Sequence, residues 1–79
     1  MKKPYLNPVT EVHLTPREKE VMHLVSKGMF DKEVASSLGI CLQTVKNILY
    51  NVYTKMNVSN RVEAIIVFKD IGGGQGVRA

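Results

Sequence analysis

Apolar residues recur every three or four positions along much of this chain, a spacing that places them on one face of an α-helix. Four stretches have this spacing, and glycines or polar residues typical of helix ends separate them. They predict helices over residues 16–26, 31–38, 42–56 and 60–70. The predicted fold class is therefore all-α, a four-helix domain.

Recognisable capping residues stand at the ends of the predicted helices. Thr15 is the expected N-cap of the first helix, Pro16 is its first residue, and Glu18 completes a capping box with Thr15. Gly28 follows this helix, and Ser59 is the expected cap of the last one. Residues 1–13 are predicted to form an extended arm and the glycine-rich residues 71–79 a flexible tail, which leaves 14–70 as the domain.

The second and third predicted helices form a helix-turn-helix pattern. Ala35 is small enough for the two helices to cross closely, and Gly39 lies where the chain must turn, often with a positive φ. Ile40 would then fill the inside of the turn. In this motif the second helix lies in the major groove of DNA, although simple helical hairpins share the helix–glycine–helix order.

Motifs along the chain resemble those of the LuxR/NarL/FixJ-type DNA-binding domain. They follow the family's order without gaps and cover about residues 14–69. The resemblance implies a four-helix, bacterial-type transcription regulator, either a standalone domain or the C-terminal fragment of a larger one. Its third helix would enter the major groove, and its fourth would form a dimer contact. The matching segments are Leu14–Val21, Gly28, Lys32–Ala35, Thr44–Lys46, Asn51–Tyr53, Lys55–Val58 and Asn60–Ala64.

Three residues depart from the family pattern. Phe30 stands where Ser or Thr usually caps the second helix, so Asp31 is a candidate cap one residue later. Cys41 stands at the usual Ser or Thr cap of the recognition helix, and a buried or partly buried cap position is the expected reason. Ile48 replaces a histidine and suits helix-turn-helix patterns in which that position is buried. We interpret the chain as a structural variant that retains DNA binding.

The charge of the chain favours an anionic partner. Its 79 residues carry a formal net charge of +4. There is no Asp or Glu from Val34 to Val62, a window that contains Lys46, Lys55 and Arg61. One side of the domain should therefore be positive, as binding to double-stranded DNA requires. The alternative is an ordinary solvated surface.

The outward face of the third predicted helix carries the candidate DNA contacts. Gln43 shares a ridge there with Lys46, which can donate to guanine, and Asn47, which can pair with adenine. The resemblance implies base contacts by Lys46, Asn47 and Tyr50. Thr44, near the helix N-terminus, is expected to bond phosphate. The remaining predicted phosphate contacts are Lys55 and Arg61.

The last predicted helix is apolar around more of its circumference than one core contact can cover. Ala64, Ile65 and Phe68 can face the core. The neighbouring face then holds Val62, Ile66 and the aliphatic stem of Lys69. We expect a two-fold homodimer through this face, which would set two recognition helices about one DNA turn apart on an inverted repeat.

Nothing in the sequence predicts an enzyme, a cofactor or a metal site. There is no glycine-rich phosphate loop, and His13 and His23 lie far apart without a second type of ligand. No signal peptide or membrane-spanning run is present, and the single cysteine suits a reducing compartment. The expected location is the cytoplasm, at the nucleoid, without a membrane partner.

Two functions remain open from the sequence. The first is a transcription regulator that binds double-stranded DNA sequence-specifically as a dimer, with RNA polymerase or another regulator as a further candidate partner. The second is an interaction module that kept the fold but binds and modulates another transcription regulator. The unusual cap residues and the single lysine on the ridge favour the second, whereas Thr44, Lys46, Lys55 and Arg61 favour the first.

Overall fold

The computed structural model describes residues 12–71 of the chain, and all regular secondary structure in this part is α-helical. The helices are α2 (Pro16–Ser26), α3 (Asp31–Leu38), α4 (Leu42–Met56) and α5 (Arg61–Asp70). These bounds confirm the all-α prediction, with a start one residue later for the last helix. The predictions for residues 1–11 of the arm and 72–79 of the tail lie outside the described residues.

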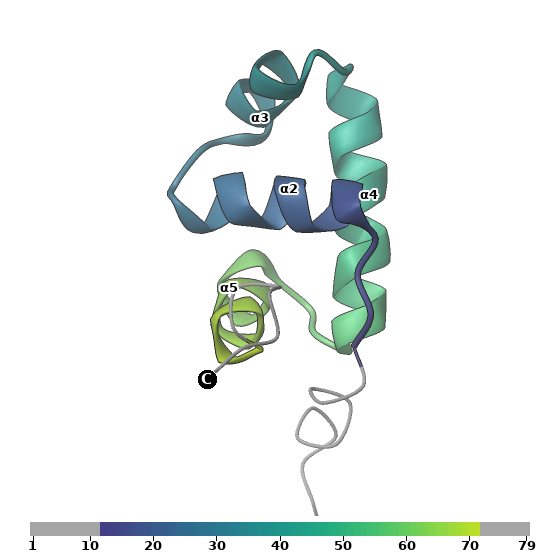
Figure 1. Ribbon diagram of the computed structural model, residues 1–79, viewed down its shortest axis with the longest axis vertical. Coiled ribbons are helices and arrows are strands. Elements are labelled where there is room, and N and C mark those ends of the chain that lie inside the picture. Colours follow the sequence, from purple (N-terminus) through teal and green to yellow (C-terminus); the bar gives the residue numbers. More distant parts are fainter. Residues whose placement is uncertain (1–11, 72–79) are drawn as a thin grey trace, which may run out of the picture.

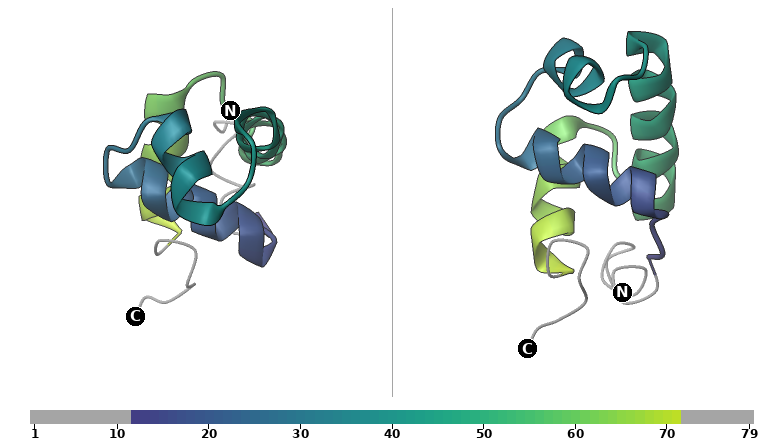
Figure 2. Two further views of the ribbon diagram at one scale, coloured as in Figure 1. Left: turned by 90° about the horizontal axis from the view of Figure 1, so that it is seen from above. Right: turned by 45° about the horizontal axis from the view of Figure 1, so that its top comes forward.

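The longest helix, α4, packs against each of the other three. Figures 1 and 2 show α3, α2 and α5 following one another along the length of α4, with α2 in the middle. One apolar core lies where they meet, and the chain on either side, at Val12 and Ile71, also packs against it. The largest fully buried side chains of the core are Phe68, Met22, Met56, Val21, Val25, Val34, Val45 and Val52.

The N-terminus of α2 has the capping box that the sequence predicts. The Thr15 hydroxyl accepts the Glu18 amide at 3.1 Å, and the Glu18 carboxylate accepts the Thr15 amide at 2.8 Å. Two N–H groups at the start of the helix are thereby satisfied. The box also brings the Glu18 carboxylate back over the helix end, where it is buried.

The caps of two other helices differ from the prediction. Asn60, and not Ser59, caps α5, because its side chain accepts the Glu63 amide at 2.9 Å. At α3, Phe30 is the N-cap and contributes no side-chain bond, while Glu33 accepts its amide at 2.7 Å. Asp31 is the first helical residue and does not take over as the cap.

The turn between α3 and α4 follows the predicted helix-turn-helix geometry. Gly39 ends α3 with a φ of 70°, in the left-handed region that disfavours side chains with a Cβ. The Ile40 amide then donates to the Ala35 carbonyl at 3.0 Å, which closes the turn. Ile40 is half-buried and packs against the core, as expected of a residue that fills the turn.

Cys41 occupies the N-cap of α4, but its thiol is exposed, so the expectation of a buried or partly buried cap position is wrong. The thiol makes no capping bond to a backbone amide and lies 3.1 Å from the Thr44 hydroxyl oxygen. Its hydrogen bond with Thr44 lowers the pKa of the thiol. Sulfur is a poor acceptor for the amides of the first turn, so these are left to solvent or to a ligand.

Replacing Cys41 with serine is expected to stabilise the domain. A hydroxyl can accept an amide of the first turn of α4, and the exposed position leaves no apolar niche to disturb. The expected rise in melting temperature is up to about 6 °C for a domain of this size. Cys41→Ala is the control, since it removes the thiol without adding an acceptor. A melting temperature for Cys41→Ser no higher than that of Cys41→Ala would show that the hydroxyl does not cap.

Candidate nucleic-acid interface

The outward ridge of α4 is present as the sequence predicts. Gln43, Lys46, Asn47 and Tyr50 are all exposed, and the Tyr50 side chain keeps 71% of its surface accessible. The opposite side of the helix is buried in the core through Val45, Leu49, Val52 and Met56. Burial of this inward stripe fixes how α4 is rotated about its own axis. That orientation places the four polar side chains together on the solvent-exposed side.

Two of the ridge residues are already in contact. The Gln43 side-chain amide donates to the side-chain oxygen Oδ1 of Asn47 at 3.1 Å, across one turn of the helix. That oxygen has a second lone pair, and the Asn47 amide nitrogen keeps its donors. Asn47 therefore retains what a paired bond to adenine needs, an acceptor for N6 and a donor for N7.

The first turn of α4, at one end of the ridge, has features that suit the binding of an anion. Thr44 is half-buried there, with its hydroxyl beside the Cys41 thiol. The first turn contains no acidic residue, so nothing opposes the positive end of the helix dipole. A phosphate near Thr44 would find a hydroxyl donor and the amides that Cys41 leaves uncapped.

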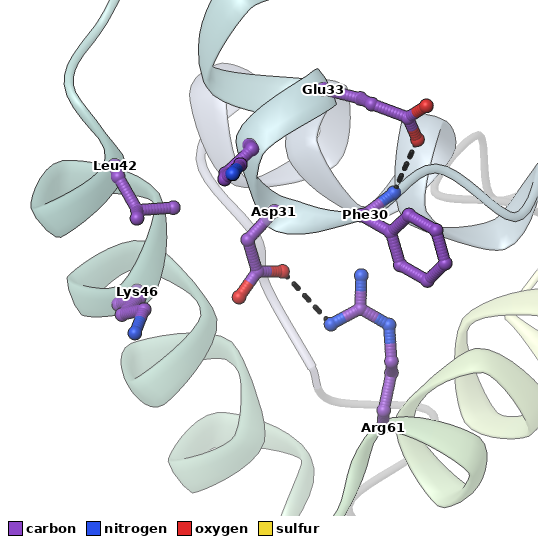
Figure 3. A pocket seen from close by; sticks show the side chains of 7 residues that line it. Phe30, Asp31, Glu33, Leu42, Lys46 and Arg61 are labelled. Carbon is purple, nitrogen blue, oxygen red and sulfur yellow. Dashed lines mark hydrogen bonds and ion pairs between the residues drawn. The ribbon is translucent and has the colours of Figure 1, made fainter.

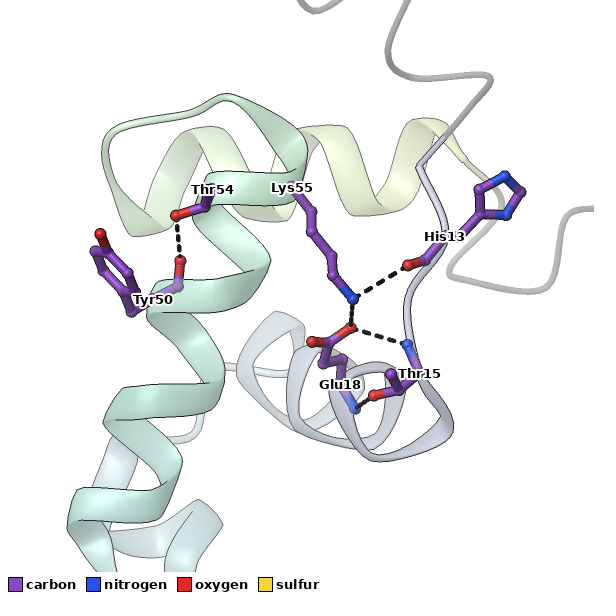
Figure 4. A network of polar contacts seen from close by, with 6 residues as sticks. All are labelled: His13, Thr15, Glu18, Tyr50, Thr54 and Lys55. Carbon is purple, nitrogen blue, oxygen red and sulfur yellow. Dashed lines mark hydrogen bonds and ion pairs between the residues drawn. The ribbon is translucent and has the colours of Figure 1, made fainter.

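Lys55 lies away from the ridge and is bound within the chain. Its ammonium contacts the Glu18 carboxylate at 2.7 Å and the His13 carbonyl at 3.3 Å, which ties α4 to the start of α2. Figure 4 shows Tyr50 on one side of α4 and this network on the other. The phosphate contact of Lys55 stays a prediction, and its direct structural role is to hold two helices together.

The contacts around Glu18 have an effect on its ionisation. Burial by itself raises the pKa of the Glu18 carboxyl, but the hydrogen bonds from Lys55 and from the Thr15 amide outweigh it. The net result is a pKa below the usual 4.5. A carboxyl with a depressed pKa stabilises the fold at pH values above its unfolded pKa, and this contribution is lost as pH falls through the folded pKa.

Replacing Glu18 with glutamine is expected to destabilise the domain by about 1–2 kcal/mol at neutral pH, since it removes charge-assisted hydrogen bonds. Below pH 4.5 the difference from the wild-type protein should shrink, because there the wild-type carboxyl becomes protonated as well. Denaturant melts between pH 3 and pH 7 measure both effects. Glu20→Gln, on the exposed side of the same helix, is the control. An equal difference at all pH values would mean that ionised Glu18 contributes nothing.

Arg61 is also bound within the chain. Its guanidinium contacts the Asp31 carboxylate at 2.9 Å and the Met29 carbonyl at 2.9 Å, which links the starts of α5 and α3. Of the three cations that the sequence places in the acid-free window, Lys55 and Arg61 are therefore both paired with carboxylates. Within residues 12–71, Lys46 makes no ion pair, so the positive surface is narrower than the count of cations predicts. The phosphate contact of Arg61 stays a prediction.

Neither pairing could be read from the sequence. The partners are 37 residues apart for Lys55 and Glu18, and 30 apart for Arg61 and Asp31. They meet only because α4 and α5 pack against particular ends of α2 and α3. A local signal did exist for the missed cap, since Asn60 precedes Glu63 by three residues, the spacing of a capping box.

The apolar face of α5 is exposed as expected. Val62 keeps 66% of its surface accessible and Ile66 keeps 56%, and Lys69 is exposed beside them. The core-facing side of α5 holds Ala64, Val67 and Phe68, all buried, together with half-buried Ile65. Large apolar side chains that are exposed are few among residues 12–71; the others are Phe30 and Tyr50.

Other kinds of site find no support among residues 12–71. No three His, Cys, Asp or Glu side chains there gather as metal ligands would. No helix in that range is long and apolar enough to cross a membrane.

Comparison with known proteins identifies relatives of most of the described region. The profile of bacterial regulatory proteins of the luxR family matches residues 12–68. The nitrate/nitrite response regulator protein NarP of Escherichia coli is 44% identical over 62 residues, and the transcriptional regulatory protein DesR of Bacillus subtilis is 46% identical over 59. The response regulator protein VraR of Staphylococcus aureus is 40% identical over 53 residues.

These matches span most of this chain but a small part of each relative. They cover 78% of the chain against NarP, 75% against DesR and 67% against VraR. The matched segment amounts to 29%, 30% and 25% of those proteins, respectively. The similarity therefore concerns one domain of larger regulators.

Proposed function

This chain belongs to the luxR family of bacterial regulatory proteins as a helix-turn-helix DNA-binding domain, and we propose that it reads duplex DNA sequence-specifically through α4 as a dimer. The family is one of DNA-binding regulators and not of enzymes. The observation that carries the finer proposal is the ridge of α4, whose polar side chains are exposed together on a helix fixed by its buried stripe.

We propose separate roles for the residues of the ridge. Lys46 and Asn47 contact base edges in the major groove, where ammonium and amide groups distinguish guanine and adenine. Tyr50 packs its exposed ring against a thymine methyl or a sugar. Gln43 supports Asn47 through their hydrogen bond, and Thr44 binds phosphate at the start of the helix.

The phosphate contacts predicted for Lys55 and Arg61 have less support. Each cation already binds a carboxylate and a backbone carbonyl within the chain. A phosphate would compete with these partners for the same donors. The better-supported role for both is to hold α4 and α5 against the rest of the domain.

We propose that the dimer forms through the exposed apolar face of α5. Val62 and Ile66 lie one helical turn apart, and Lys69 can add its aliphatic stem. The face is small, so the pairing is expected to be weak in solution and to become complete on DNA. Two copies bound in this way would recognise an inverted repeat.

The alternative function, an interaction module for another transcription regulator, has one observation in its favour: the same apolar face of α5 could accept a different protein.

A regulator that reads chromosomal DNA would act in the cytoplasm at the nucleoid, with RNA polymerase or another regulator as its next partner. This location and these partners are part of the proposed function.

Selection from random duplexes tests the proposal. Tagged protein is incubated with a random-sequence duplex library and excess nonspecific DNA at about 0.15 M salt, where nonspecific phosphate binding is weakened. The retained duplexes are expected to share one sequence in inverted repeat. Retention of unrelated sequences would reduce the proposal to nonspecific binding, and retention of none would favour the interaction module.

A further inference from the structure

A shallow groove runs along the side of the candidate interface, between the starts of α3 and α5 and the first half of α4 (Figure 3). It contains three cations: Lys46 of the ridge, Lys32, and Arg61, which is paired with a carboxylate. It also contains two carboxylates, which are unfavourable neighbours for a surface that has to meet phosphates. The residues that line it are Phe30, Asp31, Lys32, Glu33, Leu42, Lys46 and Arg61.

Both carboxylates of the groove are occupied by partners within the chain. Glu33 accepts the Phe30 amide at 2.7 Å. Asp31 accepts from one nitrogen of Arg61 at 2.9 Å, and the other terminal nitrogen of the same guanidinium donates to the Met29 carbonyl at 2.9 Å. This second bond fixes the guanidinium on the side of Asp31 that faces α5. The side chains are 35% exposed for Arg61 and 26% for Asp31, so water competes with the pair less than at an open surface.

Lys46 lines the same groove from the side of α4. In Figure 3 the Asp31 carboxylate lies between Lys46 and Arg61, and only Arg61 is joined to it. A lysine side chain is a point charge on a flexible four-carbon stem, so it would turn toward a free carboxylate in reach. Asp31 and Lys46 line the same groove, so we expect that without Arg61 the unpaired carboxylate would compete with DNA for the Lys46 ammonium.

We propose that Arg61 is a positioning residue that holds the Asp31 carboxylate away from Lys46 and so keeps Lys46 available to DNA. The inference rests on the proposed function, because it assigns Arg61 to the same interface. It differs from a phosphate clamp, in which Arg61 would itself contact DNA. In the proposed role, the loss of DNA affinity on removing Arg61 is caused by the Asp31 charge. Affinity should therefore return when that charge is also removed.

A double-mutant cycle on the duplex with the highest affinity in the selection tests this role. Arg61→Met keeps the aliphatic bulk and removes the charge, and it is expected to lower affinity roughly tenfold through the competing carboxylate. Adding Asp31→Asn should restore affinity to within about threefold of wild type. Asp31→Asn alone should change affinity by less than about twofold, since Arg61 already neutralises that carboxylate.

Matched controls separate this effect from a general change of charge. Arg17 and Glu20 form an exposed pair at 3.2 Å on α2, and Arg17→Met with Glu20→Gln makes the same charge changes away from the groove. Their affinities should stay close to wild type, with no rescue between them. Thermal melts of all variants show which are folded at the temperature of the binding assay, and affinities are compared only among those, because removing both partners of an ion pair also relieves the cost of an unpaired charge.

Three results of the binding measurements would overturn the inference. Weak binding by Arg61→Met that Asp31→Asn does not repair would indicate that Arg61 itself contacts a phosphate. Tighter binding by Asp31→Asn alone would indicate the same. Unchanged binding by Arg61→Met would remove any role at the interface.

A measurement without DNA keeps the two proposals distinguishable. The side-chain ammonium resonance of Lys46 should shift in Arg61→Met and return in the double variant, whether or not any duplex binds. A resonance that does not move would refute the positioning role alone. Absence of binding by the wild-type chain would instead refute the proposed function.

Discussion

Replacing Ile66 with glutamate is expected to abolish cooperative binding to the two halves of an inverted repeat. Ile66 is 56% exposed on α5, so the added carboxylate meets solvent in the monomer and leaves the fold intact. In the proposed dimer the same carboxylate would be buried against its own symmetry mate, where two like charges lose solvent together.

The size of this effect follows from multivalency. Linking two weak half-site contacts typically raises affinity by about 100-fold or more, and the variant should fall back to the affinity of a single half-site. The cooperativity is measured in gel-shift titrations of two duplexes, one with a single half-site and one with both half-sites. His23→Glu adds the same charge at an exposed position of α2 and is the control. Undiminished cooperativity in Ile66→Glu would rule out the α5 face as the dimer contact.

Replacing Lys46 with alanine is expected to cost about 1–3 kcal/mol on the selected site and to relax the base preference at one position. Lys46 is exposed on the ridge and makes no ion pair among residues 12–71, so its ammonium is available for a guanine edge. Removing Asn47 should act in the same way at an adenine.

The control for this prediction is Lys19→Ala, which removes an equal charge from the exposed surface of α2. It should weaken specific and nonspecific duplexes by the same small factor. Affinities measured on the selected site, on single-base variants of it and on unrelated DNA distinguish the two patterns. Equal losses on specific and nonspecific DNA for Lys46→Ala would remove this lysine from the base-reading residues.

Much of the fold follows from local features of the sequence. Apolar spacing predicted the helices, and Thr15 with Glu18 marked the start of α2 because a capping box depends only on residues close in sequence. The left-handed turn at Gly39 was predictable for the same reason. Where two capping residues stood side by side, as at Ser59 and Asn60, the three-residue spacing between Asn60 and Glu63 was the local signal for the cap that the structure has.

The candidate site was less predictable, and the reason is its dependence on tertiary contacts. The ridge of α4 could be predicted, since its outward face is the complement of the buried stripe. The availability of each cation could not, because Lys55 and Arg61 find their carboxylates on helices distant in sequence. Counting charges along the chain therefore overestimated the free positive surface, and Lys46 is left as the cation on which base reading is proposed to depend.

Methylation protection with dimethyl sulfate tests whether α4 enters the major groove. This reagent methylates guanine N7 in the major groove and adenine N3 in the minor groove. On the selected duplex, the protein is expected to protect guanine N7 in two clusters separated by about 10 base pairs, one for each copy of α4. Lys46→Ala should remove the protection at one guanine in each cluster. Protection confined to adenine N3, or no protection at saturating protein, would show that α4 does not enter the major groove.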